Sequence, residues 1–151
     1  MPLLRLMDRA DLDVYYEADV LRSSQVVKDV VTREVFKAFY EGAASVGFEY
    51  DGKPIGGVLF DGDTAHIAVL PEYHGRWGRL LRPMLAWLYG MKQEIIVRID
   101  DDNVKGLKFV EHCGWERLHE LNGEVYYRMT PWGAGRVARI ARAPQEAVAA
   151  A

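Results

Sequence analysis

Apolar and polar residues alternate along the chain in patterns that divide it into short strands and helices. Leu3–Leu6 is typical of a first strand, and Asp8 or Asp11 is a suitable N-cap for a helix that follows it. Apolar residues then recur at helical spacing over residues 31–40, and Gly42 ends that pattern. We therefore expect one strand and two helices in the first third of the chain.

The middle of the chain predicts an antiparallel meander. Three apolar runs over residues 44–70 are separated by Asp51-Gly52 and Asp61-Gly62, and each of these pairs is a strong hairpin signal. A loop, PEYHGRWGR, and an apolar helical segment, LLRPMLAWLYGMK, follow the meander.

The second half of the chain alternates between helix and strand. A strand pattern over Glu94–Ile99 is followed by helical spacing in DDNVKGLKFVEHCGW, and Glu124–Met129 is the last predicted strand. This order favours an α/β fold with a central, mixed, mostly antiparallel and twisted sheet of six to seven strands, flanked by about four helices.

Composition and charge narrow the class of protein. The chain has 151 residues, half of them apolar, and a net charge of -3, which argues against a surface devoted wholly to DNA. Its lone cysteine, Cys113, cannot form an internal disulfide, so a reducing compartment such as the cytoplasm is expected. No apolar run reaches the roughly 20 residues that a membrane-spanning helix needs. We expect one domain over residues 1–130 and a basic, Ala-rich tail over residues 131–151, helical or disordered.

The stretch after the meander is the best candidate for an anion site. Residues 71–92 hold four basic residues against one acidic residue, a local net charge of +3 in an acidic chain. The amides of a helix's first turn lack intrahelical partners and attract phosphate. Gly75 and Gly78 permit close approach of the backbone, while Arg76 and Arg79 offer bidentate pairing. An ordinary exposed glycine turn with solvated arginines is the alternative.

Three segments of the chain resemble the GNAT superfamily of acyl-CoA N-acyltransferases. VLPEYHGRWG is similar to the family's pyrophosphate loop, Asn103 with GLKFVEHCGWE to its asparagine-helix segment, and EVYYRM to its final strand. The similarity extends over residues 44–129, and the Gly-Arg-Trp loop is similar to members encoded by bacteriophages.

The resemblance implies a fold, a co-substrate and a reaction. Acetyl-CoA is expected in a cleft between two splayed parallel strands, where an amine attacks the thioester directly. Carried over by position, Ile67, Ala68 and Val69 offer backbone groups to the pantetheine arm, and Asn103 lies beside it. The pyrophosphate loop comprises His74, Gly75, Arg76, Trp77, Gly78 and Arg79. The splayed strand also directs an amide at the thioester carbonyl, where negative charge grows during the reaction.

The sequence departs from the family pattern in three places. Trp77 and Arg79 stand where the family has glycines, and Val110 stands where a general-acid tyrosine is frequent. These departures leave open a catalytically inactive GNAT-fold protein with a coenzyme-binding, structural or interaction role. A third alternative makes the basic tail, with Trp132, a site for nucleic acid or a protein partner.

Three residues on or beside the meander strands are candidate bases for the amine. They are Glu49, Asp63 and His66. A structural or surface role for His66 and a solvated-turn role for Asp63 are the alternatives. The acceptor is a small-molecule or protein amine that the sequence does not identify, and a homodimer is compatible with the expected sheet edges. His112, Cys113 and His119 lack metal-ligand spacing, so no metal is expected.

Overall fold

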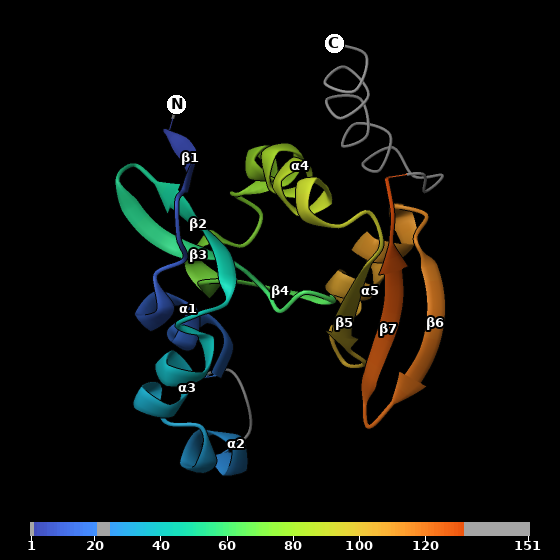
Figure 1. Ribbon diagram of the computed structural model, residues 1–151, viewed down its shortest axis with the longest axis horizontal. Helices are drawn as coiled ribbons and strands as arrows, with labels where there is room; N and C mark the ends of the chain where they lie inside the picture. Colours follow the sequence, from blue (N-terminus) through green and yellow to red (C-terminus); the bar gives the residue numbers. More distant parts are fainter. Residues whose placement is uncertain (1, 21–24, 132–151) are drawn as a thin grey trace. The chain divides into compact units, whose positions relative to one another are not determined.

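The structure, a computed structural model, describes residues 2–20 and 25–131 of the chain (Figure 1). Within these residues there are seven strands and five α-helices. In chain order they are β1 (Leu4–Met7), α1 (Leu12–Asp19), α2 (Gln25–Val30), α3 (Arg33–Tyr40), β2 (Ala44–Tyr50), β3 (Lys53–Phe60), β4 (Thr64–Val69), α4 (Leu81–Met91), β5 (Ile95–Asp100), α5 (Val104–His112), β6 (Glu116–Leu121) and β7 (Glu124–Met129). Two 3-10 turns, η2 (Pro71–Tyr73) and η3 (Gly78–Leu80), lie between β4 and α4.

The strands form a mixed sheet in the order β1-β2-β3-β4-β5-β7-β6. The pairs β1–β2, β2–β3, β5–β7 and β6–β7 are antiparallel, whereas β4 and β5 are parallel. The predicted α/β fold with a mixed, mostly antiparallel sheet is therefore confirmed. The described residues divide into two compact units, one of residues 2–20, 25–61 and 66–81, and one of residues 62–65 and 82–131.

The core of the first unit lies where α1 and α3 cover one face of its strands. Tyr15 on α1 and Phe36 on α3 are buried together with Leu59 of β3 and with Ala68 and Leu70, at the end of β4 and just beyond it. Since alternate side chains of a strand point to the same face, the even-numbered residues of β4 face these two helices.

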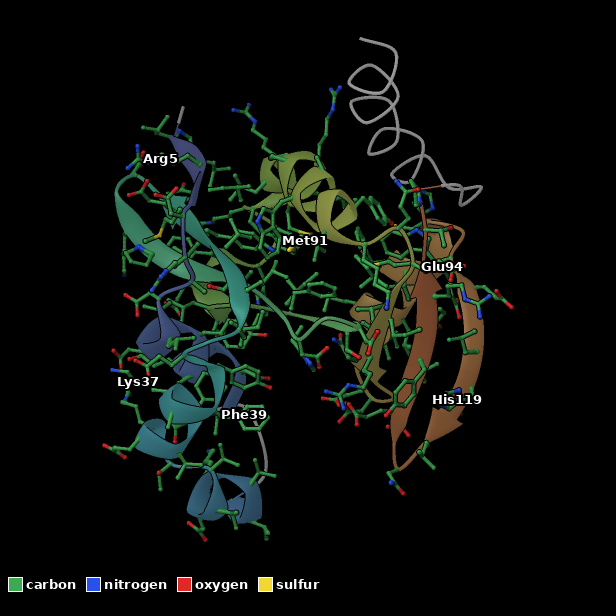
Figure 2. All side chains as sticks on the ribbon, viewed as in Figure 1. Arg5, Lys37, Phe39, Met91, Glu94 and His119 are labelled. Carbon is green, nitrogen blue, oxygen red and sulfur yellow. The ribbon has the colours of Figure 1, made fainter. Side chains whose placement is uncertain are left out.

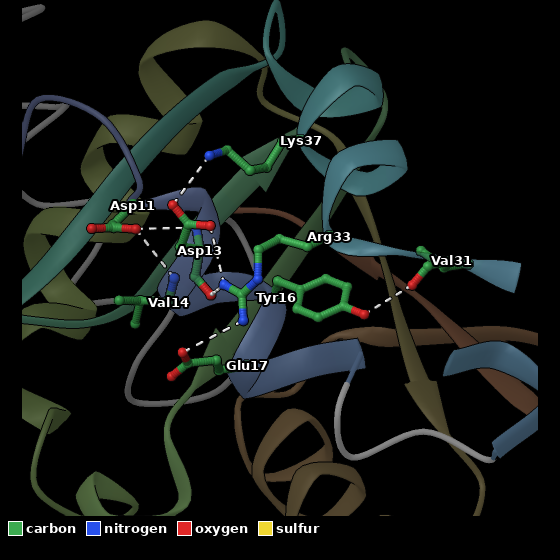
Figure 3. Close-up of polar contacts among 8 residues, drawn as sticks. All are labelled: Asp11, Asp13, Val14, Tyr16, Glu17, Val31, Arg33 and Lys37. Atoms are coloured by element: carbon green, nitrogen blue, oxygen red, sulfur yellow. Dashed lines mark hydrogen bonds and ion pairs between the residues drawn. The ribbon is translucent and has the colours of Figure 1, made fainter. Parts of the chain in front are cut away.

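Polar contacts join α1 to α3 beside this core (Figure 3). Asp13 accepts hydrogen bonds from Arg33, at 3.0 Å, and from Lys37, at 3.2 Å. Hydrogen bonds from these two side chains, Arg33 foremost, lower the pKa of Asp13. The Tyr16 hydroxyl donates to the Val31 carbonyl at 3.0 Å, and the Arg33 guanidinium lies 5.0 Å from the Tyr16 ring centroid. The contacts fix the two helices to each other.

The second unit consists of β5, β7 and β6, the first two residues of β4, helix α4 after its first residue, and helix α5. Figure 1 shows β5, β7 and β6 side by side. The α4 side chains Met84, Leu85, Leu88 and Tyr89 are buried. Pro83 is the third residue of α4, where a missing amide costs no intrahelical hydrogen bond, so the predicted helix start near residues 78–80 is close to the observed one.

Two elements differ from the sequence-based expectation. The helix α2 was not predicted, since its three valines have modest helix propensity and all its side chains are outside the core. The strand β6 was also missed, although Asn122 and Gly123 both have positive φ and form its turn to β7. Most of the expected tail, residues 132–151, lies outside the described residues, so the predicted boundary at residue 130 stays a prediction.

None of the helices in the described part of the chain is both long and apolar enough to cross a membrane.

Candidate functional site

The backbone groups of β4 point alternately to two different neighbours. The Leu70 amide, just past the strand, donates to the Ile55 carbonyl of β3 at 2.8 Å. The Asp63 carbonyl, just before the strand, accepts from the Ile96 amide of β5 at 2.9 Å. Because these directions alternate along an extended strand, the even-numbered residues of β4 bond towards β3 and the odd-numbered ones towards the opposite edge.

Of the three residues predicted to bind the pantetheine arm, this alternation directs the backbone groups of two away from β3 and those of the third towards β3. The parallel register with β5 covers residues 64–65, so Ile67 and Val69 lie beyond it with their backbone groups at the opposite edge from β3. The Ala68 carbonyl faces β3 instead, and it lies 2.2 Å from the position that a Cβ on Gly56 would take. Ile67 and Val69 thus have the backbone direction that pairing with an extended ligand needs, whereas Ala68 does not.

One carbonyl on this edge of β4 already has a partner. The His74 Nε2 lies 2.8 Å from the Val69 carbonyl oxygen, so this ring nitrogen carries the proton and donates. The bond ties the loop after β4 to the end of the strand. It leaves the Ile67 amide and carbonyl and the Val69 amide as the groups that an extended ligand can reach on this edge.

The predicted pyrophosphate loop uses two of its amides in its own turns. The His74 amide donates to the Pro71 carbonyl at 3.2 Å, and the Arg76 amide donates to the Tyr73 carbonyl at 3.0 Å. Neither amide is available to a phosphate while these turns persist. The contribution of Arg76 would therefore come from its exposed side chain.

Three other amides of the loop remain without an acceptor. Within residues 74–78, all of which the structure describes, these are the amides of Gly75, Trp77 and Gly78. Gly75 has a φ of +82°, a left-handed conformation that glycine adopts without strain, and both glycines are exposed. Successive amides in such a turn form a concave site suited to an anion. The exposed Arg79 side chain adds positive charge nearby.

Trp77 fixes the loop against the sheet of the first unit. Its ring stacks on Phe48 of β2, with centroids 5.2 Å apart and planes 19° from parallel, and Phe48 is fully buried. Trp77, which the resemblance sets in a glycine position, therefore packs on Phe48 and leaves its own amide without an acceptor. This arrangement resolves how the loop accommodates tryptophan.

Asn103 is the N-cap of α5 in the second unit. Its Oδ1 accepts from the Gly106 amide at 3.0 Å, and its Nδ2 lies 2.7 Å from where a Cβ on Gly106 would stand. The side chain thus fixes the beginning of the helix. Its predicted place beside the pantetheine arm is untested.

Glu49, the first candidate base, is paired with an arginine. It is a nearly buried residue of β2, and its two oxygens accept from the Nε and Nη2 of Arg5 on β1, a residue labelled in Figure 2. The hydrogen bond to Glu49, reinforced by its charge, raises the pKa of Arg5. Because both oxygens are occupied by one guanidinium, Glu49 is better suited to joining β1 and β2 than to accepting a proton.

Asp63, the second candidate base, is a solvated turn residue. Its side chain is 78% exposed and forms an ion pair with Lys92, at the end of α4. This geometry matches the role of an exposed hairpin residue that the sequence left as an alternative.

His66, the third candidate base, has a more enclosed setting. As an even-numbered residue of β4 it faces α1 and α3, and its side chain is 19% exposed. Its Nε2 lies 3.8 Å from an Asp61 carboxylate oxygen, and its ring centroid lies 6.4 Å from that of Tyr40 on α3. Asp61 was predicted only as a turn residue, and neither Asp61 nor Tyr40 was predicted as part of the site. The alternation that places His66 on the helix-covered face would have indicated an α3 neighbour.

The residue that the resemblance aligns with a general-acid tyrosine is apolar. Val110 on α5 is 3% exposed and contributes to the core. The neighbouring Glu111 accepts a hydrogen bond at 3.3 Å from the hydroxyl of Tyr127, a buried residue of β7. Burial, followed by the charge of Glu111, raises the pKa of Tyr127. Among the described residues, no group of three or more His, Cys, Asp or Glu side chains is placed to hold a metal ion.

A mixed sheet whose middle strand leads through a glycine-containing loop into a helix is the architecture of the GNAT N-acetyltransferases, and this chain has that fold. No family model and no curated protein matches the sequence. The likeness is therefore one of structure.

Three solved structures illustrate the likeness. An N-acetyltransferase of Staphylococcus aureus has a TM-score of 0.66 and 15% identity, over 86% of this chain and 98% of its own. A GCN5-related N-acetyltransferase of Rhodopseudomonas palustris has a TM-score of 0.63 and 20% identity, over 86% and 96%. The PaiA N-acetyltransferase of Thermoplasma acidophilum, in complex with coenzyme A, has a TM-score of 0.58 and 13% identity, over 85% and 99%.

Proposed function

We propose that the protein is an N-acyltransferase that moves the acetyl group of acetyl-CoA to a primary amine. The observation that carries the proposal is the set of three amides without acceptors, at Gly75, Trp77 and Gly78, in the loop that follows β4. The GNAT fold supports it, because a coenzyme A complex is known among the solved structures that share the fold.

The residues of this chain suit the parts of the coenzyme in turn. The loop amides, together with the side chains of Arg76 and Arg79, would hold the pyrophosphate by charge-assisted hydrogen bonds. The outward backbone groups of Ile67 and Val69 would pair with the amides of the pantetheine arm. Binding of this kind fixes the thioester in position for attack, which is itself a large part of catalysis.

The reaction needs a neutral amine and a route for its proton. The amine nitrogen attacks the thioester carbonyl, the C–S bond breaks, and coenzyme A leaves as the thiolate. We assign His66 as the base that accepts the proton from the attacking amine, directly or through water, since its side chain is enclosed beside Asp61, whereas Glu49 is paired with Arg5 and Asp63 is largely exposed. The thiolate then takes its proton from solvent, because Val110 cannot supply one.

Coenzyme binding without turnover is the second candidate function. The buried Val110 in the general-acid position is the observation that favours it. The proposed role of the basic tail in binding nucleic acid or a protein partner concerns residues outside the described part of the chain.

An isosteric pair of substitutions at Gly75 tests the loop. Asp and Asn both tolerate the left-handed conformation of this residue, but only Asp places a negative charge beside the bound phosphates. The unaltered protein and Gly75→Asn should gain about 2.7 kcal/mol in stability from coenzyme A at 100 times its dissociation constant. Gly75→Asp should lose most of that gain, as measured by the melting temperature with and without coenzyme A.

Gly90→Glu controls for the added charge alone. Gly90 is an exposed residue near the end of α4 with no atom within 4 Å of an added Cβ. This variant should keep the full coenzyme shift. Absence of any shift in the unaltered protein would refute the proposed function, and an equal shift in Gly75→Asp would show that the loop is not the phosphate site.

Substitution of His66 tests the catalytic assignment. His66→Gln should slow release of coenzyme A thiol by roughly 10²-fold or more, as expected for loss of a general base, and leave the coenzyme-induced melting shift unchanged. The acidic limb of the rate profile against pH should disappear in the variant. Unaltered rates on the acidic side would remove His66 from the mechanism.

A further inference from the structure

Helix α3 carries aromatic and apolar side chains on two adjacent stripes. Phe36 and Tyr40, four residues apart, face the core of the first unit, where Phe36 is 4% exposed. Val35 and Phe39, also four residues apart, face solvent with exposed fractions of 54% and 76%. The solvent-facing side of a surface helix is normally polar. The exposed stripe of Val35 and Phe39 is therefore suited to contact with an apolar ligand.

The rings of this helix form a continuous row that ends at the candidate base. Phe39 meets Tyr40 edge to face, with centroids 4.8 Å apart, and Tyr40 lies 6.4 Å from His66 in a similar orientation. Phe36 supports Tyr40 from the core at 4.9 Å. The row therefore leads from a solvent-exposed ring to the enclosed imidazole on β4, and Figure 2 marks Phe39 on α3.

A carboxylate stands at the inner end of the row. Asp61 lies 3.8 Å from the Nε2 of His66, so the base has negative charge beside it. Amines reach the enzyme mostly as ammonium ions at neutral pH, and a carboxylate near the base would attract that form. The charged residue nearest in sequence on α3, Lys37, is paired with Asp13.

We propose that the row of Phe39, Tyr40 and His66 is the acceptor site, and that the acceptor is a primary amine carrying an aromatic group. The inference rests on the proposed acetyl transfer and on His66 as its base. The ring of the acceptor packs against Phe39 and Tyr40, and its nitrogen lies near His66 and Asp61. Aromatic side chains suit this role because they bury a large area with few rotatable bonds and favour edge-to-face partners.

The test compares three acceptors of different character. Release of coenzyme A thiol from acetyl-CoA is measured with 2-phenylethylamine, butylamine and spermidine. We expect the highest kcat/KM with 2-phenylethylamine. Phe39→Ala should lower that value by roughly three- to tenfold, the range expected for loss of one aromatic pair, and lower the value for butylamine, which has no ring, by a clearly smaller factor.

Two further variants keep the test specific. Phe39→Leu retains apolar area without a ring and should give an intermediate loss with 2-phenylethylamine. Leu121→Ala removes a residue of comparable exposure from β6, 53% exposed and outside the row, and should change no acceptor's rate. Sedimentation of the unaltered protein and Phe39→Ala should give the same mass.

The outcomes separate this inference from the proposed function. Turnover of spermidine or butylamine at equal or higher kcat/KM would overturn the aromatic acceptor while keeping acetyl transfer. Equal losses for all amines in Phe39→Ala, or a fall in sedimented mass that identifies a second copy on this face, would also overturn it. Failure of all three amines despite an intact coenzyme A melting shift counts against the acceptor site, whereas loss of the shift itself counts against the proposed function.

Discussion

Several polar or aromatic residues at the candidate site use their side chains to fix the local structure and not to contact a ligand. His74 bonds to the Val69 carbonyl, Asn103 caps α5, and the indole of Trp77 packs on Phe48. The groups left for a ligand are therefore mainly backbone amides. This division suits the proposed phosphate site, because amides fixed by surrounding contacts need no reorganisation when the ligand binds.

The lone cysteine provides a prediction at this scale. Cys113 has no exposed surface, and burial raises the pKa of its thiol to about 11. Since the thiolate is the reactive form, the folded protein should react very slowly with iodoacetamide at pH 8 and completely after denaturation. Mass spectrometry measures both, and Cys113→Ala should show no labelling in either state.

The raised pKa of the Cys113 thiol also makes the stability of the protein depend on pH. A thiol whose pKa is raised by folding stabilises the native state below its unfolded pKa of about 8.5, and this contribution is lost as the pH rises towards 11. Unfolding free energies should therefore fall more steeply over that window in the unaltered protein than in Cys113→Ala. Rapid labelling of the native protein at pH 8 would contradict a buried thiol.

At the scale of elements, β4 is held to β3 by an unusually close approach. A Cβ on Gly56 would stand 2.2 Å from the Ala68 carbonyl oxygen and 2.8 Å from the Val69 Cα. The β2–β3 ladder also shifts register between Phe48 and Glu49, opposite this point. Both features determine where the outward edge of β4, with Ile67 and Val69, is presented.

Gly56→Ala should therefore separate these two strands. We expect a loss of about 1–3 kcal/mol in the free energy of unfolding, as for other insertions into tightly packed sites, together with weaker coenzyme A binding. Denaturant titration gives the first quantity and the coenzyme-induced melting shift the second. The matched variant Gly42→Ala, where an added Cβ meets nothing within 4 Å, should change neither. Equal stability of the two variants would show that β3 and β4 relax freely.

At the scale of the whole molecule, the sequence predicted most of the element order but not every element. Asp51-Gly52 marked its hairpin correctly, and both residues have positive φ. The equivalent Asn122-Gly123 was overlooked because β6 is largely exposed and lacks an apolar run. The missed α2 has no buried side chain, so no burial pattern marked it.

The candidate site was predictable as a segment but not in its details. Gly75 and its basic neighbours, just before an expected helix, indicated an anion loop. The amides that lack an acceptor are determined by the hydrogen bonds within the turns, such as that from the Arg76 amide to the Tyr73 carbonyl. The local sequence does not specify these hydrogen bonds. The aromatic neighbourhood of His66 depends on contact between β4 and α3, which are distant in the chain.

The Arg5–Glu49 pair has a further consequence for how the chain assembles. It joins residues 44 positions apart, whereas the β2–β3 hairpin closes over a tight local turn. During synthesis from the N-terminus, β1 has no partner until β2 has emerged from the ribosome. Strand β1 therefore remains unpaired during early synthesis, and it completes the edge of the sheet only after later segments have paired.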